Sequence, residues 1–206
     1  MSTTTTTPQR QGRGGRKRIL AAAAQLFATQ GINATGMEQV AQKAPVSKRT
    51  LYAHFRTKND LVIAHLEGLV LSGDTVESVL TREDIPPRDR ILKLFDRLPA
   101  DVEPVRGCPF IDAAAEFPDP ESAVHSYARE QKLRMVRLIA AAAAELGCRE
   151  PLALAEQLAT LADGAASRAM VLGEADYGRH ARAAAEVLLE QALPNANRRG
   201  RGHGGL

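Results

Sequence analysis

Residues 44–60 read APVSKRTLYAHFRTKND, a stretch in which basic and aromatic side chains are interleaved. Ser47 is a preferred N-cap residue, so the stretch predicts a short helix over about residues 48–55. Leu51 and Phe55 are four positions apart and would lie on one side of that helix, facing a small core. Three further residues with the same spacing would share a different side, which faces solvent or a partner: Lys48, Tyr52 and Arg56.

Two helices are predicted before this stretch. The first covers about residues 16–30, where apolar residues recur at helical spacing and Gly31 supplies a stop signal. The second is short, has Thr35 as its N-cap, and is broken by Pro45. Two short helices joined by a tight turn form a helix-turn-helix, whose second helix enters the major groove of DNA. The segment therefore predicts a DNA-binding module.

The charge of the chain supports this prediction. Residues 1–58 contain ten basic residues and a single acid, Glu38, a net charge of +9, whereas residues 59–206 contain seventeen basic and twenty-three acidic residues, a net charge of −6. A cationic segment suits a polyanion, because binding to phosphates releases counterions. The chain also has no nucleotide-binding glycine loop, nucleophile elbow or His-Glu metal motif, so an enzyme is not expected.

Ten residues are candidate DNA contacts. Lys and Arg side chains donate to guanine edges, hydroxyl groups reach phosphate oxygens, and a basic arm ahead of the motif can enter the minor groove. The alternative for these cations is an ordinary solvated helix face or a solubilising tail. The candidates are Arg16, Lys17, Thr35, Ser47, Lys48, Arg49, Thr50, Tyr52, His54 and Lys58.

The sequence over about residues 16–62 resembles the N-terminal domain of the TetR family of transcriptional regulators. The matching pattern is Ile-Leu, Ala-Ala, Leu-Phe, Gly, Thr, Val-Ala, Val-Ser-Lys, Thr-Leu-Tyr, His-Phe, Lys and Leu, in that order. The resemblance implies a homodimer that binds a roughly palindromic operator in double-stranded DNA. It also implies a C-terminal helical domain that binds a small-molecule effector and thereby weakens DNA binding, as in a repressor.

Pro45 departs from the family pattern, which usually has glycine in this turn. Glycine allows positive φ, whereas the proline ring holds φ near about −65°. We therefore expect the turn to be built differently, with the unusual dihedral angles on a neighbouring residue.

The remainder of the chain also has helical periodicity and no strand-like alternation, which predicts an all-α fold. Six more helices are expected, beginning near Asn59 or Asp60, at Pro87, after Gly107, near Ser122, at Pro151 and near Tyr177. The predicted organisation is a disordered basic arm (1–15), a three-helix DNA-binding domain (16–62), a six-helix effector-binding and dimerisation domain (63–194), and a disordered basic tail (195–206).

The resemblance also suggests where the second domain dimerises and binds its effector. In the family, the last two helices of each protomer form a four-helix bundle with those of the partner. A core within one chain would have the same apolar pattern. The candidates for the dimer interface are Leu158, Ala162, Ala166, Ala185, Leu188 and Leu189. Seven residues are candidates for an effector pocket, although a filled core would look identical: His65, Phe95, Leu98, Phe110, Asp112, Phe117 and Met135.

Cysteine content and hydropathy limit the remaining possibilities. The two cysteines, Cys108 and Cys148, are too few for a disulfide scaffold, which favours the reducing cytoplasm. A regulator that senses thiol oxidation through this pair is one alternative, and a non-specific DNA-binding protein is another. Adding His125 gives no tight metal-ligand spacing, so neither a metal nor a cofactor is predicted. No apolar run approaches the length of about 20 residues that a membrane span requires.

Overall fold

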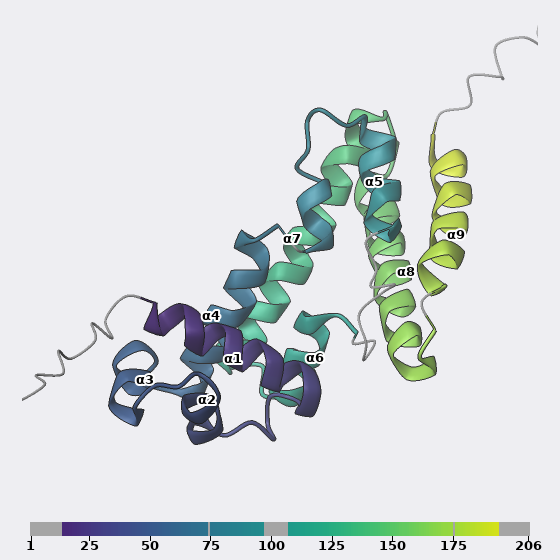
Figure 1. Ribbon diagram of the computed structural model, residues 1–206. Coiled ribbons are helices and arrows are strands. Elements are labelled where there is room, and N and C mark those ends of the chain that lie inside the picture. Colours follow the sequence, from purple (N-terminus) through teal and green to yellow (C-terminus); the bar gives the residue numbers. More distant parts are fainter. Residues whose placement is uncertain (1–13, 74, 97–106, 175, 194–206) are drawn as a thin grey trace, which may run out of the picture. The chain divides into compact units, whose positions relative to one another are not determined.

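The computed structural model describes residues 14–73, 75–96, 107–174 and 176–193, which contain nine α-helices, one 3-10 helix and no strand. The all-α prediction is therefore confirmed (Figure 1). The chain divides into two compact units, Met1–Glu67 and Gly68–Leu206.

The first unit contains α1 (Gly15–Gln30), α2 (Met37–Lys43), α3 (Lys48–His54) and most of α4 (Lys58–Leu71). Helices α1, α2 and α3 pack against one another around a small apolar core (Figure 1). Gly31 ends α1 with φ of 90°, and its N–H donates to the Phe27 carbonyl, as expected for a glycine stop signal. The buried core residues include Ile19, Phe27, Val40, Leu51, Phe55 and Leu61.

The start of α2 differs from the prediction. Its N-cap is Gly36, whose N–H donates to the Gln39 side chain over 2.7 Å. Thr35 lies one residue earlier and is 1% exposed, and its hydroxyl donates to the Gly31 carbonyl over 2.7 Å. The prediction that Thr35 caps α2 is therefore wrong, because its side chain closes the preceding turn instead.

The start of α4 also differs from the prediction, which named Asn59 or Asp60 as its cap. The Asp60 N–H donates to the Thr57 hydroxyl over 3.1 Å, while the Thr57 N–H donates to the Asp60 carboxylate over 2.9 Å. This reciprocal pair is a capping box, with Thr57 at the N-cap and the acid three residues later.

The turn between α2 and α3 places the unusual dihedral angle on Pro45 itself, with φ of +24°. The expectation that a neighbour would carry it is wrong. The N–H of Val46 donates to the Ala41 carbonyl over 3.1 Å, which is the outer hydrogen bond of a Schellman motif. This motif requires positive φ at the residue after the helix cap Ala44, and that residue is Pro45. The turn therefore has the geometry of a glycine turn with a strained proline in it.

We expect Pro45→Gly to stabilise the protein, because glycine adopts positive φ without a steric penalty. Pro45→Gly should also be more stable than Pro45→Ala by about 1 kcal/mol, which reverses the usual order of the two residues. Urea denaturation followed by circular dichroism measures all three proteins. A Pro45→Ala variant as stable as Pro45→Gly would contradict the requirement for positive φ.

His65 of α4 packs against α1 within the first unit. Its ring meets the Phe27 ring edge-on, with 5.4 Å between the centroids and an angle of 69° between the planes. Burial of the imidazole lowers the pKa of His65, because the charged form would lose hydration. His65 is thus part of the apolar packing that holds α1 and α4 together.

We expect this imidazole to make the protein less stable in mild acid. The unfolded chain binds a proton as the pH falls through the ordinary pKa of histidine, about 6.5, while folded His65 resists protonation until a lower pH. Stability should therefore be full above that pH and decrease below it. In His65→Gln, denaturation between about pH 7 and pH 5 should show a smaller loss of stability than in the wild type. Equal losses in the two proteins would assign the pH dependence to other groups.

The second unit contains a short 3-10 helix, η1 (Val76–Val79), and five helices. These helices are α5 (Pro87–Asp96), α6 (Pro109–Glu116), α7 (Ala123–Glu145), α8 (Pro151–Leu172) and α9 (Tyr177–Ala192). Helix α8 packs between α7 and α9, and α5 also contacts α7 and α9 (Figure 1). Two further glycines in the left-handed region end helices of this unit, since Gly147 and Gly173 follow α7 and α8 with φ of 77° and 67°.

Five of the six predicted dimer residues are buried within this unit, and Leu188 is partly exposed. Leu158, Ala185 and Leu189 are fully buried in the core of the chain, and Leu188 packs against the same core. Ala162 and Ala166 are each 3% exposed. These residues were predicted from a helical stripe of apolar side chains, and that stripe faces the neighbouring helices of the same chain. Burial within the chain therefore leaves little of these side chains, apart from Leu188, for a partner, and their assignment to a dimer interface stays a prediction.

Candidate DNA-binding site

Helix α3 is fixed by its cap and by its inward side. The Ser47 hydroxyl accepts a hydrogen bond from the Thr50 N–H over 3.1 Å, and the two hydroxyls share a further hydrogen bond of 2.8 Å. The predicted N-cap is thus confirmed. Leu51 and Phe55 are buried in the core, also as predicted. Lys48, Arg49 and Tyr52 of this helix are exposed, as is Arg56, which follows the C-cap Phe55. We call these four residues the α3 outer face.

Two features of the α3 outer face suit a nucleic acid. Tyr52 is 46% exposed, whereas tyrosine side chains are more often largely buried. Arg49 is exposed, and its guanidinium forms no hydrogen bond or ion pair with a described residue. The face therefore presents a donor-rich cation and a phenol hydroxyl to solvent, next to the N-terminus of the helix.

Lys48 has an acidic neighbour from α2. Its ammonium donates to the Glu38 carboxylate, and both side chains remain exposed. The hydrogen bond to this carboxylate and its negative charge raise the pKa of Lys48. Sequence reasoning did not include Glu38 in the site, although it is the single acid among residues 1–58.

The beginning of α1 lies beside the end of α3. The guanidinium of Arg16 lies 5.4 Å from the centre of the Phe55 ring, a cation–π arrangement. A side chain at Gly15 would place its Cβ 3.2 Å from Nε2 of His54, so the exposed imidazole would have to move slightly to admit it. A surface depression of about 510 Å³ is lined by Gly14, Gly15, Arg16, Lys17, Leu20 and His54. Free N–H groups at a helix N-terminus attract phosphate, so this depression extends the cationic surface.

The remaining candidates have partners within the chain. The Lys58 ammonium donates to the Asn33 carbonyl over 3.1 Å. Thr50 uses its hydroxyl in the cap of α3. Thr35 is buried and its hydroxyl is engaged with the Gly31 carbonyl, so its assignment as a DNA contact is contradicted.

The effector-pocket candidates are not all described by the structure. Leu98 lies outside the described residues, and His65 belongs to the first unit. Phe95 and Met135 lie in the main hydrophobic core of the second unit, and Phe110 is also buried. Asp112 and Phe117 are partly exposed on α6 and at its end. An effector pocket formed by these residues stays a prediction.

Sequence reasoning missed several buried polar atoms of the second unit, among them one oxygen of Glu77 and one of Gln131. Oε2 of Glu77 and Oε1 of Gln131 have no hydrogen-bond partner among the described residues. The nearest cation to this carboxylate is Arg134, at 3.6 Å, and Arg134 is three residues after Gln131 on α7. Burial raises the pKa of Glu77, as expected for a carboxylate with so little hydration. No sequence pattern distinguishes these residues from exposed polar positions of a helix.

The cysteines and possible metal ligands add no second site. Both cysteines are free thiols, and burial raises the pKa of Cys108, which disfavours the reactive thiolate. Among the described residues no three His, Cys, Asp or Glu side chains are grouped as they would be around a metal ion. Within the same residues, no helix has the length and apolar character of a membrane span.

Comparison with known proteins agrees with this geometry. Residues 19–65 match the model of bacterial regulatory proteins of the tetR family. The chain is 41% identical over 59 residues to the HTH-type transcriptional activator FasR of Mycolicibacterium smegmatis, an alignment that covers 27% of each protein. It is 34% identical over 116 residues to the uncharacterized HTH-type transcriptional regulator YvkB of Bacillus subtilis, covering 50% of this chain and 59% of YvkB. The alignments thus span less than two thirds of these curated relatives.

A solved structure extends the similarity over most of the chain. The crystal structure described as a TetR transcriptional regulator of Streptomyces avermitilis is 30% identical, with a TM-score of 0.76. The comparison covers 86% of this chain and 97% of that one. Together with the helix-turn-helix formed by α2 and α3, this similarity shows that the chain belongs to the TetR family of transcriptional regulators.

Proposed function

We propose that this regulator binds a palindromic operator as a homodimer and releases it when a small molecule binds to the second unit. The observation that carries the proposal is the α3 outer face, which is anchored from behind by buried residues and presents cations beside a helix N-terminus. In a helix-turn-helix, side chains at the N-terminus of the second helix contact base edges. A regulator of this kind acts as a repressor where its operator overlaps a promoter.

Each residue of the cationic surface has a chemical role in this proposal. Arg49 and Lys48 donate to the guanine acceptors N7 and O6 in the major groove. The Tyr52 hydroxyl, the N-terminus of α1 and Lys17 bind phosphate oxygens, which fix the register of the protein on the duplex. Arg16 is held over the Phe55 ring and can donate to the backbone on the same side.

The dimer in this proposal uses the outward sides of α8 and α9. Val171 on α8 and Val187 on α9 are 74% and 53% exposed. Gly164 is exposed in the interior of α8, and a side chain there would meet nothing within 4 Å. Glycine weakens a helix, so its presence without any intrachain need favours a close approach by a partner helix.

The effector in this proposal carries hydrogen-bond donors on an apolar or amphipathic body. Oε2 of Glu77, which has an ion pair with Arg134 over 3.6 Å, and Oε1 of Gln131 each accept no hydrogen bond from a described residue, and a buried acceptor is stabilised when a donor reaches it. A ligand shifts the equilibrium between two conformations of the protein only by the difference between its affinities for them. Release of DNA therefore requires that the conformation with bound effector fits the operator poorly.

Replacing Lys48, Arg49 and Tyr52 together by alanine should lower operator affinity by about 100-fold or more, because guanine and phosphate contacts are lost together. The operator would first be obtained by selecting genomic fragments with the wild-type protein at two salt concentrations, and affinity then measured by fluorescence anisotropy. Lys93→Ala with Arg149→Ala removes two exposed cations from the second unit and serves as the control. Unchanged affinity in the triple variant would refute the assignment of the α3 outer face.

Val187→Glu should convert the dimer into a monomer, since a buried unpaired charge at an interface costs several kcal/mol. Light scattering after size-exclusion chromatography measures the mass of each species. Leu71→Glu introduces the same charge at an exposed apolar residue on α4 and should leave the mass unchanged. A dimeric Val187→Glu variant would exclude this side of α9 from the interface.

A further inference from the structure

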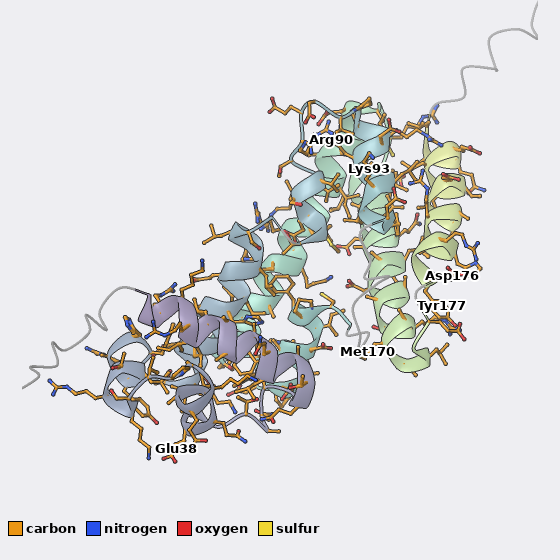
Figure 2. All side chains as sticks on the ribbon, viewed as in Figure 1. Glu38, Arg90, Lys93, Met170, Asp176 and Tyr177 are labelled. Atoms are coloured by element: carbon orange, nitrogen blue, oxygen red, sulfur yellow. The ribbon has the colours of Figure 1, made fainter. Side chains whose placement is uncertain are left out.

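One acidic side chain stands within the cationic surface of the first unit. Among residues 1–58, ten basic residues accompany a single acid, Glu38. Glu38 is in the first turn of α2, and Figure 2 shows it at the outer edge of that unit. Its carboxylate accepts a hydrogen bond from Lys48, the first residue of α3. This ion pair therefore joins the two helices of the helix-turn-helix on their exposed side.

Fold stability does not explain this ion pair. The side chains of Lys48 and Glu38 are 63% and 65% exposed, and ion pairs in water contribute little to stability. The pair also lies on the side of the motif that is proposed to face DNA, where a carboxylate is repelled by phosphates. Because Glu38 opposes binding to any DNA at this place, we consider its effect on the selectivity between DNA sequences.

The ion pair changes what Lys48 can do. An ammonium group has three donors, and Glu38 occupies one of them, which leaves two for a second partner. A lysine side chain without such a partner is flexible and binds any nearby phosphate as a point charge. Held by the carboxylate, the ammonium of Lys48 is kept at the N-terminus of α3, where side chains meet base edges.

We propose that Glu38 is a specificity-determining residue that positions Lys48 for base contact and opposes binding through phosphates alone. This inference rests on the proposed DNA-binding function. The repulsion between Glu38 and the phosphates lowers the affinity for every DNA sequence. The positioned ammonium of Lys48 raises the affinity only where a base offers hydrogen-bond acceptors. The combined effect is a larger ratio between operator affinity and random-sequence affinity.

The test compares Glu38→Gln with the wild type on the selected operator and on a random duplex of the same length. Glutamine keeps the size of the side chain and removes its charge. We expect tighter binding to the random duplex, with a salt dependence steeper by about one in the slope of log K against log salt. Operator affinity should rise less or fall, so the ratio of the two affinities should decrease. Anisotropy titrations over a series of salt concentrations measure these quantities.

Two further variants separate positioning from charge. Glu67→Gln removes an exposed acid of the same unit outside the helix-turn-helix and should leave the affinity ratio unchanged. Lys48→Gln should lower the ratio by itself, and adding Glu38→Gln to it should then lower the ratio no further, because no ammonium remains to be positioned. A double variant in which the two losses simply add would overturn the positioning role.

The outcomes also distinguish this inference from the proposed function. A wild-type protein that selects no sequence over random DNA would overturn both. A wild-type protein that selects an operator, with a Glu38→Gln variant of unchanged affinity ratio, would overturn the inference and leave the function intact. The same conclusion would follow if Glu38→Gln tightened binding to both duplexes equally, since the carboxylate would then act only as a general charge.

Discussion

Burial of Leu51 and Phe55 is the constraint on which the cationic surface depends. A seven-residue helix such as α3 is too short to be stable alone in water, so its packing against α1 and α2 defines its position. Once these two side chains point inward, helical periodicity turns Arg49 and Tyr52 away from the core, while Lys48 is exposed because it is the first residue of the helix. The orientation of the basic residues therefore follows from hydrophobic packing, and charge determines only what the exposed side can bind.

Capping and stop residues in the sequence predicted most helix ends of the first unit. The helix ends that were predicted wrongly can be explained by neighbouring residues. The caps at Gly31 and Ser47 were predicted because each residue has one strong preference. The cap at Thr57 was missed because Asn59 and Asp60 are also good caps, and only the reciprocal hydrogen bonds distinguish them. The positive φ of Pro45 in the α2–α3 turn could not be predicted from the residue type. A Schellman motif imposes positive φ at this position whichever residue is present.

Periodicity was a poorer guide to contacts between elements of the second unit. Helix α8 packs between α7 and α9. Its apolar stripe, which includes Leu158 and Ala162, is therefore buried against helices of the same chain. An apolar stripe shows that a helix side is buried, but it does not show whether the covering helix belongs to the same chain. The side of α8 that we propose for the dimer has smaller signals in the sequence, such as the exposed Gly164, and the space around this glycine is known only from the structure.

The interior of the second unit limits sequence reasoning about the effector in the same way. Phe95 and Met135 would have the same sequence pattern in a filled core and in the lining of a cavity, because both need apolar side chains. Unpaired polar atoms differ, because leaving a buried acceptor without a donor costs about 1–3 kcal/mol. Among the described residues, Glu77 and Gln131 each retain such an acceptor, where apolar residues of similar size would avoid the penalty. Buried polar atoms without a hydrogen bond, rather than the apolar residues around them, are therefore the observation on which the proposed effector site depends.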